Sequence, residues 1–269
     1  WYVNMYDPNY EGQEVKYPVY GPCDYLTPGE LKHARALYAA EVTLVDRWVG
    51  RLLERIEDLG LFKNSLVILT TDHGFYHGEH GLIGKTHITP EWSRYVPLYE
   101  EVAHIPLIVH YPDCKHRREQ ALVQPPDFMP TFLQLAGAPD PGTMHGRSWL
   151  PLLEGRSTPW RDFAVTSPTI IHGAAGGARP TITTAEWALV CAGAPPAAGE
   201  FESHAVDGLA KREMVGEILP SELYHLSSDR HQERDLSIQH PEVVSELRNR
   251  FVGFLESLDT DARFIEPWR

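Results

Sequence analysis

The longest regular pattern of apolar positions runs from Thr27 to Gly60. Thr27-Pro-Gly-Glu30 has the form of a capping box, with proline at the first helical position, and Gly60 suits the turn that ends a helix. Between them, apolar side chains recur at intervals of three and four, which is the spacing of one helix face. The members of this apolar stripe are Leu31, Ala34, Tyr38, Val45, Val49, Leu52, Ile56 and Leu59. The pattern predicts a long helix whose apolar stripe packs in a core.

Two short apolar runs rich in β-branched residues predict buried strands, at 66–69 and 107–111. The first follows the long helix after a short connection, so the two form a helix–strand unit of an α/β sheet. Short helices are expected at 98–104 and between Pro125 and Gly137. Residues 142–155 are expected to form a loop that carries a short apolar patch.

From about residue 160 the pattern changes to several short strands followed by a helix that begins at Pro241. This order is typical of a small α+β subdomain. We therefore expect a large α/β domain over residues 1–160 and a small subdomain with an antiparallel sheet over 161–269. The expected strands are 164–166, 181–184, 187–190 and 223–226.

Composition restricts the class of protein only loosely. The chain has 269 residues, of which 42% are hydrophobic and 23% charged, and it contains no apolar run of about eighteen residues that could span a membrane. A formal net charge of −13 argues against a nucleic-acid surface. The three cysteines lie far apart in the sequence and do not predict a disulfide framework. Since the chain begins Trp-Tyr-Val, we expect that an upstream part is missing or was removed, and the localisation stays open.

Candidate chemistry gathers directly after the strand at 66–69. Asp72 and His73 stand at its carboxyl end, where ligands bind in α/β sheets, and the glycines that follow predict a loop. One hard oxygen and one nitrogen favour Ca²⁺, Mg²⁺ or Mn²⁺ over structural zinc, but two residues do not fill a coordination sphere. Lys85 is suited to bind a sulfate or phosphate oxygen. His87 is either a second cationic group beside it or a surface histidine.

A different interpretation of the same stretch is a zinc hydrolase. His73, His77 and His80 have the spacing i, i+4 and i+7, which would place them on one face of a helix. Glycines inside this window disfavour a helix by about 1 kcal/mol each relative to alanine. The histidines at 77 and 80 are therefore better explained as loop residues.

The stretch from Thr70 to Lys85 resembles the sulfatase family of the alkaline-phosphatase superfamily, in the branch with the pattern S/T-D-H-G-x-x-x-G-E-H-G-x-x-x-K. Further blocks resemble the family in the same order along nearly the whole chain: 41–53, 99–109, 129–137, 144–155 and 222–229. The resemblance implies an alkaline-phosphatase-like α/β fold, with a mixed, mostly parallel sheet between helices. In this chain the fold would be incomplete, and the small C-terminal subdomain would follow it.

The resemblance also implies roles for single residues. Asp72 and His73 would ligate one divalent cation, usually calcium, with manganese or magnesium as alternatives. Lys85 would contact the sulfate and the leaving-group oxygen, and His87 would lie beside it as a second substrate contact. The implied substrate is a sulfate ester of a small molecule or a saccharide.

Several family features are absent from this sequence. Sulfatases carry a C/S-x-P-x-R nucleophile that is converted to formylglycine, and an Asp-Asp pair of metal ligands, both in the first half of the chain. None of the three cysteines fits, and Ser157-Thr-Pro-Trp-Arg161 matches only as a string, at a position where the family has a Pro-Trp-Arg-Asp linker. We expect this chain to be the C-terminal half, with the N-terminal half of the same protein as its partner.

Three functions remain open on the sequence alone. They are a sulfuric ester hydrolase, a phosphonate monoester or phosphodiester hydrolase of the same superfamily, and a non-catalytic sulfatase-like protein. The organic part of the substrate is not specified, and we expect the segments 1–25, 88–97 and 172–180 to recognise it. A homo-oligomer is compatible with the sequence. An isolated half should expose an apolar edge and face, and should therefore aggregate.

Overall fold

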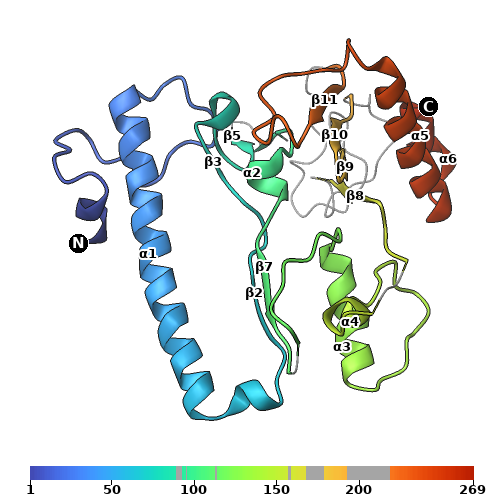
Figure 1. The fold of residues 1–269 in the computed structure, drawn as a ribbon. Coiled ribbons are helices and arrows are strands. Elements are labelled where there is room, and N and C mark those ends of the chain that lie inside the picture. Colours follow the sequence, from blue (N-terminus) through green and yellow to red (C-terminus); the bar gives the residue numbers. More distant parts are fainter. Residues whose placement is uncertain (89–92, 95, 113, 157–158, 168–178, 193–218) are drawn as a thin grey trace, which may run out of the picture. The chain divides into compact units, whose positions relative to one another are not determined.

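The computed structural model describes residues 1–88, 93–94, 96–112, 114–156, 159–167, 179–192 and 219–269 (Figure 1). They form two compact units, the first made of Trp1–Arg94 and His104–Asp113, and the second of Tyr95–Ala103 and Cys114–Arg269. The domain boundary near residue 160 stays a prediction. Ser157, part of the 88–97 segment and nearly all of the 172–180 segment lie outside the described residues.

The predicted long helix is α1 (Pro28–Asp58) in the first unit. Its capping box is formed: Thr27 Oγ1 accepts the N–H of Glu30 at 3.2 Å, and the Glu30 carboxylate accepts the N–H of Thr27 at 2.8 Å. Gly60 follows with a φ of 67°, in the left-handed region that favours glycine after a helix end. Both ends of the helix are thus set by the residues expected from the sequence.

The predicted burial of the whole apolar stripe of α1 is wrong for this chain. The buried residues of α1 lie only in its first half: His33, Ala34, Ala36 and Ala40. Farther along, Val45 and Leu52 are each 59% exposed. In the described part of the unit the 3-10 helices η1 (Tyr2–Met5) and η2 (Leu61–Lys63) and the strand β3 (Tyr76–His77) pack against α1, and each is too short to cover the apolar stripe.

The predicted strands at 66–69 and 107–111 are β2 (Val67–Thr70) and β7 (Leu107–His110), which lie side by side (Figure 1). They pair antiparallel, with Val67 opposite His110 and Thr70 opposite Leu107. We expected mostly parallel strands, whereas every pairing among the described strands is antiparallel. The chain re-enters the sheet at the end where β2 finishes, without the crossover that a parallel neighbour requires.

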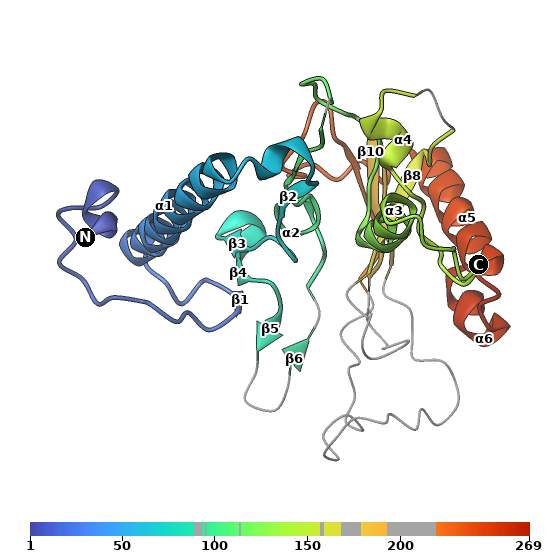
Figure 2. The same cartoon turned by 90° about the horizontal axis from the view of Figure 1, so that it is seen from below.

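Residues 74–84 were expected to form a loop, but they contain two short strands. β3 (Tyr76–His77) pairs with β4 (Leu82–Gly84), and β4 also pairs with β1 (Gly21–Pro22), so that β4 is central in a three-stranded sheet (Figure 2). The 3-10 helix η3 (Glu79–Gly81) connects β3 to β4. β5 (His87–Ile88) pairs with β6 (Ser93–Arg94). The sheet is anchored by Ile83, which is buried against Cys23 and Ala34.

The second unit contains an antiparallel sheet in the order β11-β10-β9-β8 and the helix α5 (Pro241–Ser257), which packs on β9 and β10. The strands are β8 (Phe163–Thr166), β9 (Thr181–Thr184), β10 (Trp187–Val190) and β11 (Glu222–His225). Its apolar core consists of Ile182, Leu189, Cys191, Leu223, Leu247 and Phe251. Antiparallel strands and a terminal helix thus lie where the sequence predicted them, while the small subdomain over 161–269 stays a prediction. Short helices precede and follow these elements: α2 (Glu100–Ala103), α6 (Ala262–Ile265) and η6 (Glu266–Trp268).

A buried carboxylate organises the segment before this sheet. The 3-10 helix η4 (Pro125–Asp127) leads into α3 (Phe128–Leu135), and α4 (Leu150–Leu153) lies against α3. Residues 150–153 were expected to be part of a loop, but Pro151 suits a helix start and Leu150 is buried, so one helical turn forms. Asp127 is fully buried and accepts the backbone N–H groups of Gln124 and Arg147, both at 2.8 Å. The guanidinium of Arg161 donates to both of its carboxylate oxygens.

Candidate active site

Asp72 follows β2 after a single residue, and its two carboxylate oxygens have different surroundings. Oδ1 accepts the backbone N–H of His73 at 3.0 Å and the hydroxyl of Thr71 at 3.3 Å. Oδ2 lies 3.1 Å from Nε2 of His73. The hydrogen bonds to Oδ1 therefore orient the carboxylate so that Oδ2 faces the imidazole. Thr71, which sequence reasoning did not single out, contributes to this orientation.

The tautomer of His73 follows from its backbone contact. Nδ1 lies 2.8 Å from the carbonyl oxygen of Gly74, so Nδ1 carries the hydrogen and donates it. The lone pair of a neutral ring is then on Nε2, and Nζ of Lys85 donates to it at 2.5 Å. Three predicted side chains, Asp72, His73 and Lys85, thus meet at one nitrogen atom.

Asp72 is held in its charged form. Desolvation alone would raise the pKa of its carboxyl, but the electrostatic interaction with His73 and hydrogen bonds from the amides of Asp72 and His73 and the hydroxyl of Thr71 outweigh it. The net pKa is lowered. An ionised carboxylate is the form that binds a metal ion.

These atoms fit two neighbouring ligands of one divalent cation. A separation of 3.1 Å between Oδ2 and Nε2 suits two atoms that each lie about 2.3–2.6 Å from a Ca²⁺ ion. A cation on Nε2 would use the lone pair that Lys85 contacts, so the two interactions exclude each other. Within the described part of the chain no group of three or more His, Cys, Asp or Glu residues could hold a metal ion. The described residues thus offer two ligands, where calcium takes six to eight.

Lys85 is placed by the strand that precedes it. Gly84 ends β4 with a φ of 96°, and the ring of Tyr20 covers it so closely that an added Cβ would lie 2.4 Å from Cγ of the tyrosine. His87, in β5, has its ring against Gly21. No hydrogen bond joins His87 to Asp72, His73 or Lys85 among the described residues, so the structure brings three of the four predicted residues together. Tyr20 and Gly21 were missed, because only the pairing of β1 with β4 brings them to this position.

The histidines of the alternative zinc interpretation do not share a helix face. His77 lies in β3 and His80 in η3, where its φ of 55° is in the left-handed region. The ring of His77 packs 4.0 Å from Tyr38, and burial lowers its pKa. Its Nε2 is buried without a hydrogen-bond partner. A neutral histidine packed among aromatic rings explains His77, and the helical zinc face is excluded.

Two of the three cysteines are poorly suited to act as nucleophiles. None is in a disulfide, and Cys23 and Cys191 are buried. Desolvation raises the pKa of Cys23, and it raises the pKa of Cys191 to about 12, so both thiols stay protonated near neutral pH. Arg161, the last residue of the S-x-P-x-R string, is engaged by the buried Asp127. This contact supports the interpretation of that string as a structural linker.

Comparison with known proteins identifies the family. The sulfatase family model matches residues 3–138, which include every residue of the candidate site. The chain belongs to the sulfatase family. An N-acetylglucosamine-6-O-sulfatase of Bacteroides thetaiotaomicron is 38% identical over 132 residues, which cover 47% of this chain and 22% of that protein. The matched stretch is thus a small part of the relative's length.

Solved structures support the α/β fold. BT4656 in complex with its substrate D-glucosamine-2-N,6-O-disulfate has a TM-score of 0.62 at 22% identity, and the similarity covers 88% of this chain and 44% of that one. The phosphonate monoester hydrolase SpPMH from Silicibacter pomeroyi has a TM-score of 0.61 at 23% identity, covering 86% and 42%. The chain therefore has the fold of the sulfatases over less than half the length of these proteins. None of the helices in the described residues is long and apolar enough to cross a membrane.

Proposed function

We propose that the protein to which this chain belongs hydrolyses sulfuric esters. The observation that carries the proposal is the convergence of the Asp72 carboxylate and the Lys85 ammonium on Nε2 of His73. Asp72 and His73 would hold one divalent cation, calcium in the first place and manganese or magnesium as alternatives. When bound, such a cation acts as a Lewis acid on an ester oxygen.

Lys85 acts on the transferred group in this proposal. Its ammonium stabilises the negative charge that builds on the sulfuryl and leaving-group oxygens. His87 lies two residues farther along and is assigned to the same substrate from its position in the sequence. Neither residue is a nucleophile, so the nucleophile must come from another segment.

We place the nucleophile and the remaining metal ligands on an N-terminal segment that this sequence does not contain. The nucleophile would be a formylglycine made from Cys or Ser in a C/S-x-P-x-R context. None of the three cysteines stands in that sequence context, and Arg161 is engaged by Asp127, and both observations support this placement. The exposed apolar stripe of α1 supports it as well, because the N-terminal half would cover that stripe.

The substrate we propose is a sulfated sugar. One relative is named an N-acetylglucosamine-6-O-sulfatase, and a protein of similar fold was solved with a disulfated glucosamine as its substrate. A hexosamine sulfate is therefore the first substrate to test, after a general aryl sulfate.

The experiment uses the protein with both halves, expressed with formylglycine formation, and measures 4-nitrophenyl sulfate hydrolysis. We expect turnover that disappears with EDTA and returns with Ca²⁺, and mass spectrometry should find formylglycine in the N-terminal half. A folded protein that carries formylglycine and calcium but hydrolyses neither the aryl sulfate nor a hexosamine sulfate would disprove the proposal.

A phosphonate monoester hydrolase is the second candidate, and the similarity of fold to SpPMH favours it. Sulfate and phosphonate esters both present tetrahedral oxygens to the cation and Lys85. Parallel measurements of kcat/KM on 4-nitrophenyl sulfate and 4-nitrophenyl phenylphosphonate decide between the two, and a larger value for the phosphonate would select this candidate.

A further inference from the structure

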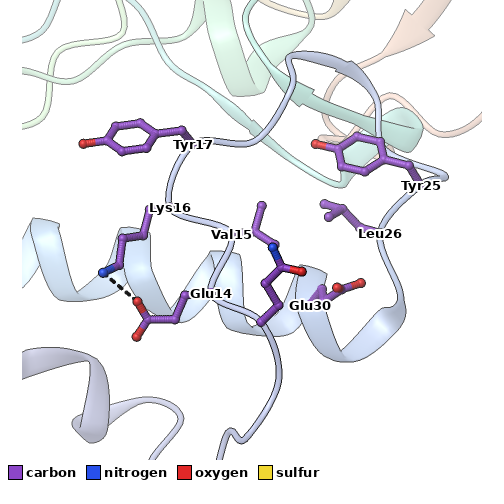
Figure 3. A pocket seen from close by; sticks show the side chains of 8 residues that line it. Glu14, Val15, Lys16, Tyr17, Tyr25, Leu26 and Glu30 are labelled. Atoms are coloured by element: carbon purple, nitrogen blue, oxygen red, sulfur yellow. Dashed lines mark ion pairs between the residues drawn. The ribbon is translucent and has the colours of Figure 1, made fainter.

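An open pocket of about 590 Å³ lies in the first unit, between the N-terminal segment and the start of α1 (Figure 3). Eight residues line it: Gln13, Glu14, Val15, Lys16, Tyr17, Tyr25, Leu26 and Glu30. In Figure 3 the Tyr25 ring and Leu26 lie on one side, Val15 faces them, and Lys16 points toward Glu14. The site assigned to the sulfate uses none of these residues.

The charged groups of the pocket are already engaged with protein partners. Lys16 pairs with Glu14 at 2.7 Å, and the carboxylate of Glu30 accepts the N–H and the hydroxyl of Thr27, both at 2.8 Å. Two carboxylates and one ammonium leave a net negative charge, which disfavours an anion. A sulfated group is therefore a poor occupant, and an uncharged one is favoured.

Aromatic surface is the other property of the pocket. Tyr17 is 94% exposed and Tyr25 is 49% exposed, although large apolar rings usually bury their area. The hydroxyl of Tyr25 donates to the carbonyl oxygen of Val19 at 3.1 Å, which holds this ring in place. An exposed ring beside polar groups suits the C–H face of a sugar, whose hydroxyls can bond to Gln13 and to the tyrosine hydroxyls.

The backbone connects this pocket to the candidate active site. Residues 13–17 lead into β1, which pairs with β4, and Tyr20 lies on Gly84 directly before Lys85. The N–H of Ile88 also donates to the carbonyl oxygen of Tyr20 at 2.8 Å. The residues that line the pocket are thus continuous in sequence with the segment that packs beside Lys85.

We propose that this pocket is a subsite for an unsulfated sugar ring of an oligosaccharide whose sulfated residue binds at Asp72, His73 and Lys85. The binding of the sulfated sugar rests on the proposed sulfatase function. The binding of the neutral sugar ring does not depend on it. A relative without this pocket would bind the sulfated sugar alone.

The test measures binding of chitotetraose, a neutral tetramer of N-acetylglucosamine, to the protein with both halves by isothermal titration calorimetry. We expect binding by the unmodified protein and a loss of about fivefold in Tyr17→Ala, the equivalent of about 1 kcal/mol for an aromatic contact. Tyr25→Phe should retain most of the binding, because it keeps the ring. Trp1→Ala is the matched control, since Trp1 is 97% exposed and outside the pocket.

Absence of chitotetraose binding, or an equal loss in Trp1→Ala, would overturn the subsite. This readout needs no hydrolysis, so it stays decisive if the protein cleaves no sulfate ester. If the protein is a sulfatase, Tyr17→Ala should also raise KM for a 6-O-sulfated chito-oligosaccharide while kcat/KM for 4-nitrophenyl sulfate stays unchanged. An equal effect on both substrates would count against the subsite as well.

Discussion

Lys85 is the residue whose removal should affect the chemistry most directly. Its ammonium contacts the same nitrogen that we assign to the metal, so it can reach a group bound to that metal. A charged donor of this kind typically contributes about 10²- to 10³-fold in rate. We therefore expect Lys85→Ala to lower kcat for 4-nitrophenyl sulfate by about this factor, while calcium content by atomic absorption is unchanged. Lys85→Arg should recover part of the rate, and a full rate in Lys85→Ala would refute the role.

Gly84, which directly precedes Lys85, allows a prediction about stability. A Cβ at this position would lie 2.4 Å from Cγ of Tyr20, in addition to the strain of a φ of 96°. Gly81 is the matched control, because its φ is also positive, at 69°, but no atom lies within 4 Å of an added Cβ. We expect Gly81→Ala to cost about 1–2 kcal/mol, the strain of the left-handed region, and Gly84→Ala to cost clearly more. Urea denaturation measures both, and equal losses would show that the contact with Tyr20 has no effect.

At the scale of elements, the sequence predicted those helices and strands whose apolar positions form a long or repeated pattern. α1 was predicted because its capping box and its apolar spacing agree, and β2, β7 and the strands of the second unit because their apolar runs stand out. Strands of two or three residues, such as β1, β3 and β4, show no period, so the sheet that positions Lys85 was not found. The proximity of Asp72, His73 and Lys85 could be predicted from the sequence motif, whereas the contacts of Thr71 and Tyr20 depend on the fold.

The segment around α3 and α4 depends on one buried ion pair. Asp127 is fully buried, and Arg161 reaches it from 34 positions later in the sequence. Removing one partner of a buried pair leaves an uncompensated charge and typically costs about 3–5 kcal/mol. We expect a loss of that size in the free energy of unfolding for Asp127→Ala. The exposed pair Arg156–Glu154 gives the control, and Glu154→Gln should cost at most about 1 kcal/mol. Similar losses in both variants would contradict a structural role for Asp127.

At the scale of the whole molecule, the chain presents one side of an active site and one side of a core. The proposed N-terminal half of the fold would account for both features, because it would supply further metal ligands and cover the apolar stripe. The stripe contains Tyr38, Val45 and Leu52, which are 48–59% exposed, and β7 adds Ile108 at 62%. Exposed apolar side chains along one face of a helix mark an interface or promote aggregation.

The isolated chain of residues 1–269 should therefore self-associate, and the N-terminal half should prevent this when the two are expressed together. We expect light scattering to show large aggregates for the chain alone and a defined complex for the pair.

Replacing the stripe residues Val45 and Leu52 by glutamate should reduce aggregation of the isolated chain, because two charges then interrupt the apolar surface. The same variant should fail to form the complex, since burial of an unpaired carboxylate is costly. Arg51→Glu, at a neighbouring exposed polar position, is the control and should leave complex formation intact. A monodisperse, cooperatively unfolding chain on its own, or a V45E/L52E variant that still pairs with the N-terminal half, would show that this stripe is not the interface.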